Sequence, residues 1–233
     1  LIYHELGNLP SALEHHLRCL QIRREILSGD DPLLLQACAD VAELYGLLGE
    51  HETELDYFLQ LLELQRDFLP EDHPDRIAPY RGAARAYGRL GRLEEQLIFL
   101  RKAARNGDTD SMNQLAKVLL RDGQYPEGIH WLNQAVRQKD VQAAYLLGSL
   151  YLGSPALTRD VKKGIRLLQW AAERYHRKAN QALGRIFLAR HPKVPEYSPI
   201  DPQAALKHLY QARRLGSTGD EPLIREAEEY LRQ

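Results

Sequence analysis

Apolar residues recur every three or four positions along most of the chain, the spacing that predicts amphipathic helices. Residues 33–49, "LLLQACADVAELYGLLG", and residues 50–69, "EHETELDYFLQLLELQRDFL", read as two such helices, and further pairs follow to the end of the sequence. A sustained alternation of apolar and polar residues, which would indicate β-strands, is not found in the sequence. The pattern therefore predicts an all-α protein made of helical hairpins.

The hairpins of the first part repeat at an interval of 42 residues. The positions that recur at this interval are Tyr3, Tyr45 and Tyr87; Leu6, Leu48 and Leu90; Gly7, Gly49 and Gly91; Leu13, Leu55 and Leu97; and Pro32 and Pro74. Gly49, Gly91 and Gly123 are expected in turns, because a residue without a Cβ readily adopts the left-handed conformation that ends many helices. The prolines are expected to begin helices. Residues 1–6 align only with the end of a first helix, so we expect the opening unit to be truncated.

The repeat plan changes near residue 108. Residues 110–136 read as a shorter helical pair. Residues 142–174 form another pair, and residues 180–214 repeat its plan with a longer Pro-rich loop, "ARHPKVPEYSPIDP". We expect this loop to be an irregular excursion inside the last pair, with Tyr197 as its aromatic residue and the repeat resuming at Asp201. The prolines that interrupt the helix are Pro192, Pro195, Pro199 and Pro202.

Hairpins of fixed period cannot bury their apolar face alone, so they stack on one another. The sequence therefore predicts an α-solenoid of antiparallel helix pairs that runs continuously through the chain. We divide it into residues 1–107 with the 42-residue period, residues 108–216 with the second plan, and residues 217–233 as a C-terminal capping helix.

The first part resembles tetratricopeptide repeats of the kinesin-light-chain type, in "LQIRREILSGDDP" and "LELQRDFLPEDHPDRIA". The second part resembles Sel1-like repeats, in "LGSLYLGS…DVKKGIRLLQWAAE" and "LGRIFLAR…DPQAALKHLYQARR". The two resemblances cover nearly the whole chain and imply a right-handed superhelix. One position departs from the family pattern: the small residue expected early in the second helix is Ala12 in one copy, but Glu54 and Gln96 in the next two.

The charge distribution is uneven although the net charge is only −1. Residues 1–100 hold 9 Lys and Arg against 18 Asp and Glu, whereas residues 101–233 hold 22 against 14. This asymmetry favours polar partners or head-to-tail contacts, and solvated helix faces are the alternative.

The two cysteines, Cys19 and Cys38, have no CxxC spacing. We expect free thiols, because the helical register places the two residues at unequal heights on neighbouring helices, too far apart for a disulfide. Free thiols fit a reducing compartment, so the cytoplasm is favoured and a bacterial periplasm stays open. The longest uncharged apolar stretch is broken by Gly and Pro, so no membrane span is expected.

Sequence signatures of catalysis are missing: there is no glycine-rich phosphate loop, no GxSxG motif and no HExxH motif. His15 and His16 are adjacent and therefore point in different directions on a helix, which makes them a poor metal-binding pair. We expect no enzymatic activity, no metal and no cofactor.

The tetratricopeptide resemblance implies that the first helix of each pair lines a concave groove. Groove positions in the second copy are Gln36, Ala39, Glu43 and Leu47. The positions that we select as a peptide-binding groove are Arg81, Arg85, Arg89, Asn113, Lys117, Arg121, Gln142, Tyr145, Lys178, Gln181 and Arg185. Amides satisfy the backbone groups of an extended peptide, and guanidinium groups bind carboxylates. The sequence thus predicts a non-enzymatic scaffold that binds an extended, acidic or polar peptide segment of a protein partner.

Three other interpretations stay open. Arg81, Arg85 and Arg89 fit equally a solvated basic face that pairs with neighbouring acids. An RNA-binding helical repeat would need stacking aromatics in register, and the groove offers chiefly Tyr145, so nucleic acid is not favoured. The chain also fits a structural segment of a larger assembly, such as a bacterial envelope scaffold. The oligomeric state and the identity of the partner are left open by the sequence.

Overall fold

The computed structural model describes residues 8–154, 157–190, 193–194 and 200–232. Within these residues the secondary structure consists of twelve α-helices and one 3-10 turn, with no strand, so the prediction of an all-α fold is confirmed. The chain divides into two compact units, residues 1–115 and residues 116–233, and we describe each unit by itself.

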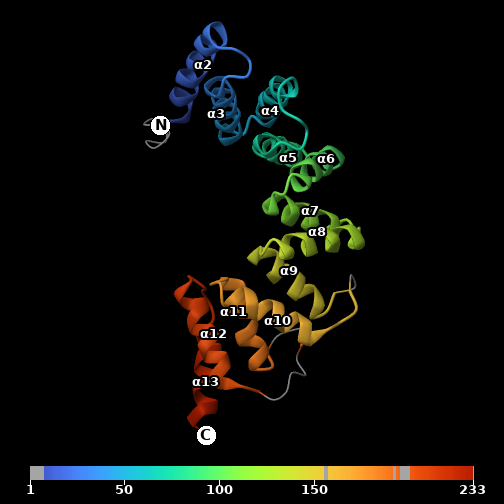
Figure 1. Ribbon diagram of the computed structural model, residues 1–233. Coiled ribbons are helices and arrows are strands. Elements are labelled where there is room, and N and C mark those ends of the chain that lie inside the picture. Colours follow the sequence, from blue (N-terminus) through green and yellow to red (C-terminus); the bar gives the residue numbers. More distant parts are fainter. Residues whose placement is uncertain (1–7, 155–156, 191–192, 195–199, 233) are drawn as a thin grey trace. The chain divides into compact units, whose positions relative to one another are not determined.

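The helices of the first unit between residues 9 and 105 each pack on the next along the chain (Figure 1). Its helices are α2 (Leu9–Ile26), α3 (Pro32–Leu48), α4 (His51–Arg66), the 3-10 turn η1 (Pro74–Arg76), α5 (Ile77–Arg89), α6 (Leu93–Arg105) and the beginning of α7 (Thr109–Arg121). Val41 and Cys38 of α3 and Leu100 of α6 are fully buried between the helices. The apolar periodicity of the sequence is therefore the packed face of each helix.

The second unit continues with shorter helices, again packed in the order of the sequence (Figure 1). They are the end of α7, α8 (Tyr125–Arg137), α9 (Val141–Tyr151), α10 (Val161–Ala172), α11 (Arg177–Phe187), α12 (Pro202–Arg214) and α13 (Glu221–Arg232). Its core contains leucines that are at most 1% exposed, namely Leu152, Leu168, Leu183, Leu188 and Leu209.

The turns follow the predicted chemistry. Gly49, Gly91 and Gly123 have φ angles of 86°, 74° and 80°, the left-handed conformation that glycine adopts without strain. Pro32 and Pro74 begin α3 and η1, and the side chain of Asp31 caps α3 by accepting a hydrogen bond from the Leu33 amide. These turn and helix-start predictions are confirmed.

The Pro-rich excursion ends where the sequence predicts that the repeat resumes. The amide of Asp201 donates to the Phe187 carbonyl at 2.9 Å, and the Asp201 side chain caps α12 at the Ala204 amide. Val194, within the excursion, is 1% exposed and packs into the core of the second unit. The predictions for Pro192, Pro195, Tyr197 and Pro199 lie outside the described residues.

Two glycines explain how large polar residues fit at the start of second helices. Glu54 of α4 lies against Gly46 of α3, where an added Cβ would stand 2.5 Å from the Cδ of Glu54. Gln96 of α6 lies against Gly88 of α5 in the same manner, 2.3 Å from an added Cβ. The departure from the family pattern is thus compensated by a glycine on the partner helix.

In the second unit two helices come close together because each has a glycine at the contact. A Cβ added to Gly148 of α9 would lie 3.0 Å from the carbonyl oxygen of Gly164 on α10, and one added to Gly164 would lie 2.9 Å from the carbonyl oxygen of Gly148. The two backbones therefore approach each other directly, without a side chain between them.

Cys38 is buried and Cys19 is half-buried, and both are free thiols. Burial raises the pKa of the Cys38 thiol above its usual value. No helix in the part of the chain that the structure describes combines the length and the apolar character needed to span a bilayer.

Candidate functional site

A hollow of about 550 Å³ opens in the first unit between α3 and α5. Its lining residues are Pro32, Leu35, Gln36, Ala39, Glu43, Phe58, Leu61, Gln65, Pro74, Asp75, Ile77, Ala78, Pro79, Arg81, Gly82 and Arg85. Phe58 and Leu61 of α4 are each 3% exposed and form part of its apolar lining. Gly82 makes room for the Phe58 ring, because a Cβ there would lie 2.3 Å from a ring carbon.

Polar groups from two successive first helices surround this hollow. Gln36 and Glu43 of α3 are exposed, and so are Arg81 and Arg85 of α5. The Gln36 amide donates to the Asp40 carboxylate at 2.7 Å, which orients it along the helix. The hollow therefore carries amide, carboxylate and guanidinium groups around an apolar lining.

Arg85 and Arg89 converge on one buried carboxylate, Glu54. The Nε and Nη2 atoms of Arg85 lie 3.0 and 2.8 Å from Glu54 Oε1, and Nη1 of Arg89 lies 3.5 Å from Oε2. Nδ1 of His51 lies 3.2 Å from Oε2. Glu54 is fully buried, and a buried carboxylate is stable only where cations or donors surround it.

Arg85 and Arg89 are also accessible to a ligand, because their side chains are each 43% exposed. Nη1 of Arg89 also donates to the Gly46 carbonyl at 3.0 Å, across to α3. Sequence reasoning identified Glu54 as a departure from the pattern but did not pair it with Arg85, which is 31 residues away. The pairing could have been found from two features of the sequence: a glycine placed opposite an acidic residue, and arginines in the first helix of the following hairpin.

Three of the selected groove residues contact a residue of the following hairpin. That residue comes directly before the first helix of the hairpin. The three groove residues occupy equivalent places in their repeats. The contacts are Arg81 with Asp108 (3.6 Å), Tyr145 with His176 (ring centroids 4.6 Å apart) and Gln181 with Asp220 (2.7 Å). The partners occupy helix starts, where side chains such as those of Asp108 and His176 accept hydrogen bonds from helix amides. The repeat therefore uses this position to hold one hairpin on the next.

His176 is neutral in this arrangement. Its Nδ1 atom accepts a hydrogen bond from the Ala179 amide, so Nε2 carries the proton and donates to the Gln142 side chain at 3.1 Å. Burial lowers the pKa of His176, and nearby Lys178 lowers it further. The ring is therefore a helix cap and a stacking partner of Tyr145, and it stays uncharged near neutral pH.

The remaining selected residues differ in exposure. Asn113 is 3% exposed. Lys117, Arg121 and Lys178 are exposed. Arg185 lies 4.0 Å from the buried carboxylate of Asp220, an arrangement like that of Arg89 and Glu54. Arg81, Arg85, Arg89 and Asn113 belong to the first unit and the other selected residues to the second.

Comparison with known proteins agrees with this geometry. The family model described as tetratricopeptide repeat matches residues 1–67. This part of the chain is similar to tetratricopeptide repeats. No curated protein matches the chain in sequence.

Solved structures extend the likeness from residues 1–67 to more of the chain. Nearly identical repeats from a putative kinesin light chain of Podosopora anserina have a TM-score of 0.58 at 20% identity, covering 73% of this chain and 89% of theirs. A Sel1 repeat protein from Oxalobacter formigenes has a TM-score of 0.61 at 15% identity, covering 89% and 84%. YrrB, described as a tetratricopeptide-repeat protein with an unusual peptide-binding site, has a TM-score of 0.53 at 19% identity, covering 90% and 97%. At these identities the likeness concerns the fold alone, and it confirms the predicted all-α solenoid fold.

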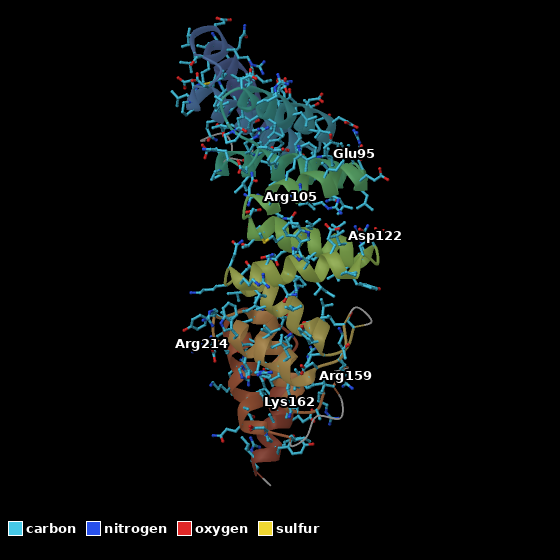
Figure 2. All side chains as sticks on the ribbon, turned by 45° about the vertical axis from the view of Figure 1, so that its right-hand side comes forward. Glu95, Arg105, Asp122, Arg159, Lys162 and Arg214 are labelled. Carbon is cyan, nitrogen blue, oxygen red and sulfur yellow. The ribbon has the colours of Figure 1, made fainter. Side chains whose placement is uncertain are left out.

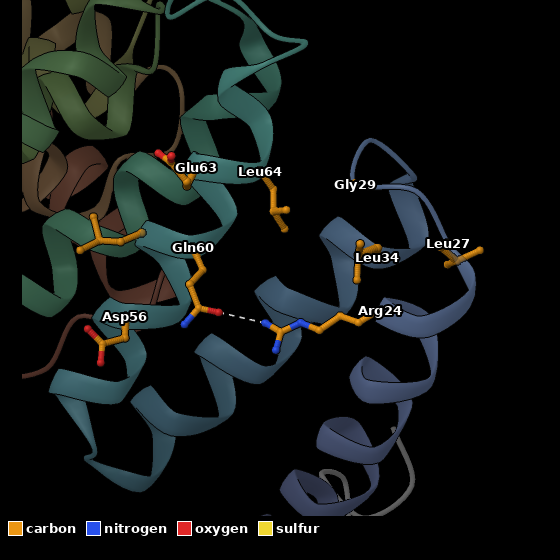
Figure 3. Close-up of a pocket in the computed structure, with 9 residues that line it drawn as sticks. Arg24, Leu27, Gly29, Leu34, Asp56, Gln60, Glu63 and Leu64 are labelled. Atoms are coloured by element: carbon orange, nitrogen blue, oxygen red, sulfur yellow. Dashed lines mark hydrogen bonds between the residues drawn. The ribbon is translucent and has the colours of Figure 1, made fainter.

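A second hollow, of about 800 Å³, lies in the first unit between the end of α2, the start of α3 and α4 (Figure 3). Arg24 crosses it and donates to the Gln60 side chain at 2.9 Å. Leu27, Leu34 and Leu64 contribute apolar surface. This hollow lies outside the first-helix positions that the sequence selected.

Within the described residues, no group of three or more His, Cys, Asp or Glu side chains is arranged to hold a metal ion. The polar groups that the site does bring together, guanidinium, carboxylate and amide, are suited to hydrogen bonding and ion pairing.

Proposed function

We propose that the first unit is a protein-interaction module whose hollow between α3 and α5 binds an extended polar segment of a partner protein. The observation that carries the proposal is the gathering of Gln36, Glu43, Arg81 and Arg85 around one hollow with an apolar lining. Tetratricopeptide and Sel1 repeats are typically protein-interaction scaffolds, and this role needs neither a cofactor nor catalysis.

The chemistry of the hollow suits a peptide that carries a carboxylate close to an amide-rich or basic stretch. Arg81 is 44% exposed and offers charge-assisted hydrogen bonds to a carboxylate. Asp108 and Asp110 each lie 3.6 Å from its Nη1 atom and compete for it, so part of the gain is offset. Glu43 and Gln36, on the facing helix, accept from and donate to peptide backbone groups.

Arg85 is a poorer recognition group than Arg81 because the buried Glu54 already holds it. We therefore assign the selectivity for acidic segments mainly to Arg81, and the coupling of the two hairpins to Arg85 and Arg89. Lys117, Arg121, Gln142, Tyr145, Lys178, Gln181 and Arg185 remain our candidates for further contacts made by the second unit.

Two features favour a peptide over RNA. Tyr145, the aromatic residue among the selected positions, already stacks on His176 and has one face occupied. The first hundred residues are strongly acidic and would repel a phosphate backbone.

The test begins with selection of binding peptides from a displayed random library against the full chain. The selected peptides are then measured against the variants Arg81→Gln and Gln36→Ala by isothermal titration calorimetry. We expect each change to weaken binding by about fivefold to tenfold, a loss of roughly 1–1.4 kcal/mol. Added salt should also weaken binding, because the groups are exposed.

A matched control is Arg105→Gln. Arg105 is an exposed arginine of α6 outside the hollow (Figure 2). Peptides that bind the Arg81→Gln and Gln36→Ala variants as tightly as the unaltered chain would place the binding site elsewhere and overturn the proposal.

A further inference from the structure

The second unit carries a basic hollow that the proposed function does not use. It encloses about 520 Å³ beside the end of α8 and along α10. Its lining residues are Val136, Lys139, Lys163, Arg166, Leu167 and Trp170. We propose that this hollow is a second docking site, and that its occupant is an acidic segment of a partner protein carrying a bulky apolar side chain.

The spacing of the α10 residues produces one continuous face. Lys163, Arg166, Leu167 and Trp170 follow the pattern i, i+3, i+4, i+7, which places them in line along a helix. Two cations stand near the start of this line, and the apolar pair stands at its end. The end of α8 adds one apolar and one cationic residue beside it.

The cationic side chains around the hollow favour an acidic ligand. Lys139, Lys163 and Arg166 are exposed, and no carboxylate side chain is among the described residues that line the hollow. Two of the acids near these residues in the sequence already cap helices: Asp140 accepts from the Ala143 amide at 2.6 Å, and Asp160 from the Lys163 amide at 2.9 Å. A third, Glu173, lies 3.8 Å from Arg174. Residues 151–200 as a whole hold 10 Lys and Arg against 3 Asp and Glu. Carboxylates from another molecule therefore complement this face.

At the apolar end of this face, Arg174 fixes the Trp170 ring in place. Trp170 is half-buried, and the guanidinium of Arg174 lies over its ring at 3.9 Å while donating to the Trp170 carbonyl at 3.0 Å. A tryptophan that is fixed before binding loses little conformational freedom on association. Partly buried tryptophans surrounded by polar residues are also the usual centres of binding energy at interfaces.

Lys139 lies in the turn that follows α8, beside the hollow. Its φ angle is 63°, a left-handed conformation that is strained for a side chain other than glycine. Gly107 takes the corresponding place after α6 in the first unit, and Tyr175 and Ala189 have similar φ angles, 61° and 54°, after α10 and α11. Lys139 therefore occupies a turn where glycine would be less strained, and it lines the hollow.

A peptide suits this hollow better than single-stranded nucleic acid. Nucleic-acid grooves use several aromatic rings on which successive bases stack. The hollow has one ring, and Arg174 covers one of its faces.

The experiment uses the full chain and fluorescein-labelled probes, read by fluorescence anisotropy at low and at high salt. The first probe is a short peptide of Asp and Glu around a central Phe. Its matched controls replace the Phe by Ala, or the acids by Lys, and a short oligo-dT strand represents nucleic acid. We expect the acidic Phe peptide to bind, the Ala peptide to bind about tenfold more weakly, and the Lys peptide to show no binding.

Two variants assign the binding to this hollow. Lys139→Gly should weaken the acidic Phe peptide by about threefold to tenfold while raising the Tm, because the strained turn is relieved. Arg166→Gln should weaken it similarly without changing the Tm. Arg137→Gln, an exposed arginine of α8 outside the lining, should bind as the unaltered chain does.

The result distinguishes this site from the hollow of the first unit. If the Arg81→Gln variant still binds the acidic Phe peptide, the proposal is supported. If that variant loses the binding, the peptide binds in the hollow of the first unit. Unchanged affinity in the Lys139→Gly, Arg166→Gln double variant, or tighter binding of oligo-dT than of the acidic Phe peptide, would overturn the proposal.

Discussion

Neighbouring helices pack on one another in different ways in the two units. In the first unit a buried carboxylate, Glu54, faces Gly46 and binds Arg85 and Arg89 from the next first helix. In the second unit Gly148 and Gly164 bring two backbones into direct contact. The first of these contacts depends on a compensated buried charge, whereas the second depends on the absence of side chains. Similar hairpins are therefore sensitive to different changes.

The largest expected effect comes from removing both cations that neutralise Glu54. The double variant Arg85→Ala, Arg89→Ala leaves a fully buried carboxylate with the His51 side chain beside it. We expect the free energy of unfolding to fall by about 3–5 kcal/mol. Urea denaturation followed by circular dichroism measures the change.

The control for this experiment is the triple variant that adds Glu54→Gln. A neutral amide costs less to bury than an unpaired carboxylate, so part of the stability should return. A double variant as stable as the unaltered chain would show that solvent neutralises Glu54 and that the arginines are free for ligands.

The second unit should instead be sensitive to a single methyl group. Gly164→Ala places a Cβ 2.8 Å from the Leu152 side chain and 2.9 Å from the Gly148 carbonyl oxygen. Because the backbone cannot move away easily, we expect a loss of about 1–3 kcal/mol in thermal or urea unfolding.

Its counterpart in the first unit is Gly88→Ala, where the added Cβ meets the flexible end of Gln96. That side chain can move aside, and alanine favours a helix by up to about 1 kcal/mol over glycine, so we expect little net change. Equal losses in the two variants would remove the distinction between the units.

Acid should weaken the second unit through two half-buried histidines, His176 and His208. Burial lowers the pKa of both His176 and His208 below the usual 6.5. The unfolded state therefore binds more protons in the range between the folded pKa and about 6.5. The stabilisation is fully present above about pH 6.5 and is lost as the pH falls through the folded pKa.

We expect the Tm of the second unit to decrease over that range, by an amount set by about 1.4 kcal/mol for each unit of pKa shift. Calorimetric scans at a series of pH values measure it. The variant His176→Asn keeps a capping side chain but does not titrate, and it should reduce the slope. An unchanged slope would assign the pH dependence to other groups.

The smallest expected effect concerns the thiols of the first unit. Cys38 is buried with a raised pKa, whereas Cys19 is half-buried. In the native protein a thiol reagent should therefore modify Cys19 faster than Cys38, and no bridge between the two should form. Mass spectrometry of the timed reaction tests both points; equal rates would indicate that the α2–α3 pair opens easily.

The sequence by itself determined the features that depend on near neighbours in the chain. The apolar spacing gives the helices, Gly49 and Gly91 give the turns, and the 42-residue interval gives the stacked hairpins, because each rests on the conformation of a few consecutive residues. The tetratricopeptide resemblance followed from the same local patterns.

The tertiary structure decided which side chains meet. Arg85 contacts Glu54, which is 31 residues away in the sequence, and Gln181 contacts Asp220, which is 39 residues away. These contacts form because one hairpin stacks on the next. A periodic pattern places Arg81 and Arg85 on the same face but cannot say which acid neutralises each of them. The partners of a charge depend on the distance and burial of residues far apart in the sequence, and only the packed helices set these.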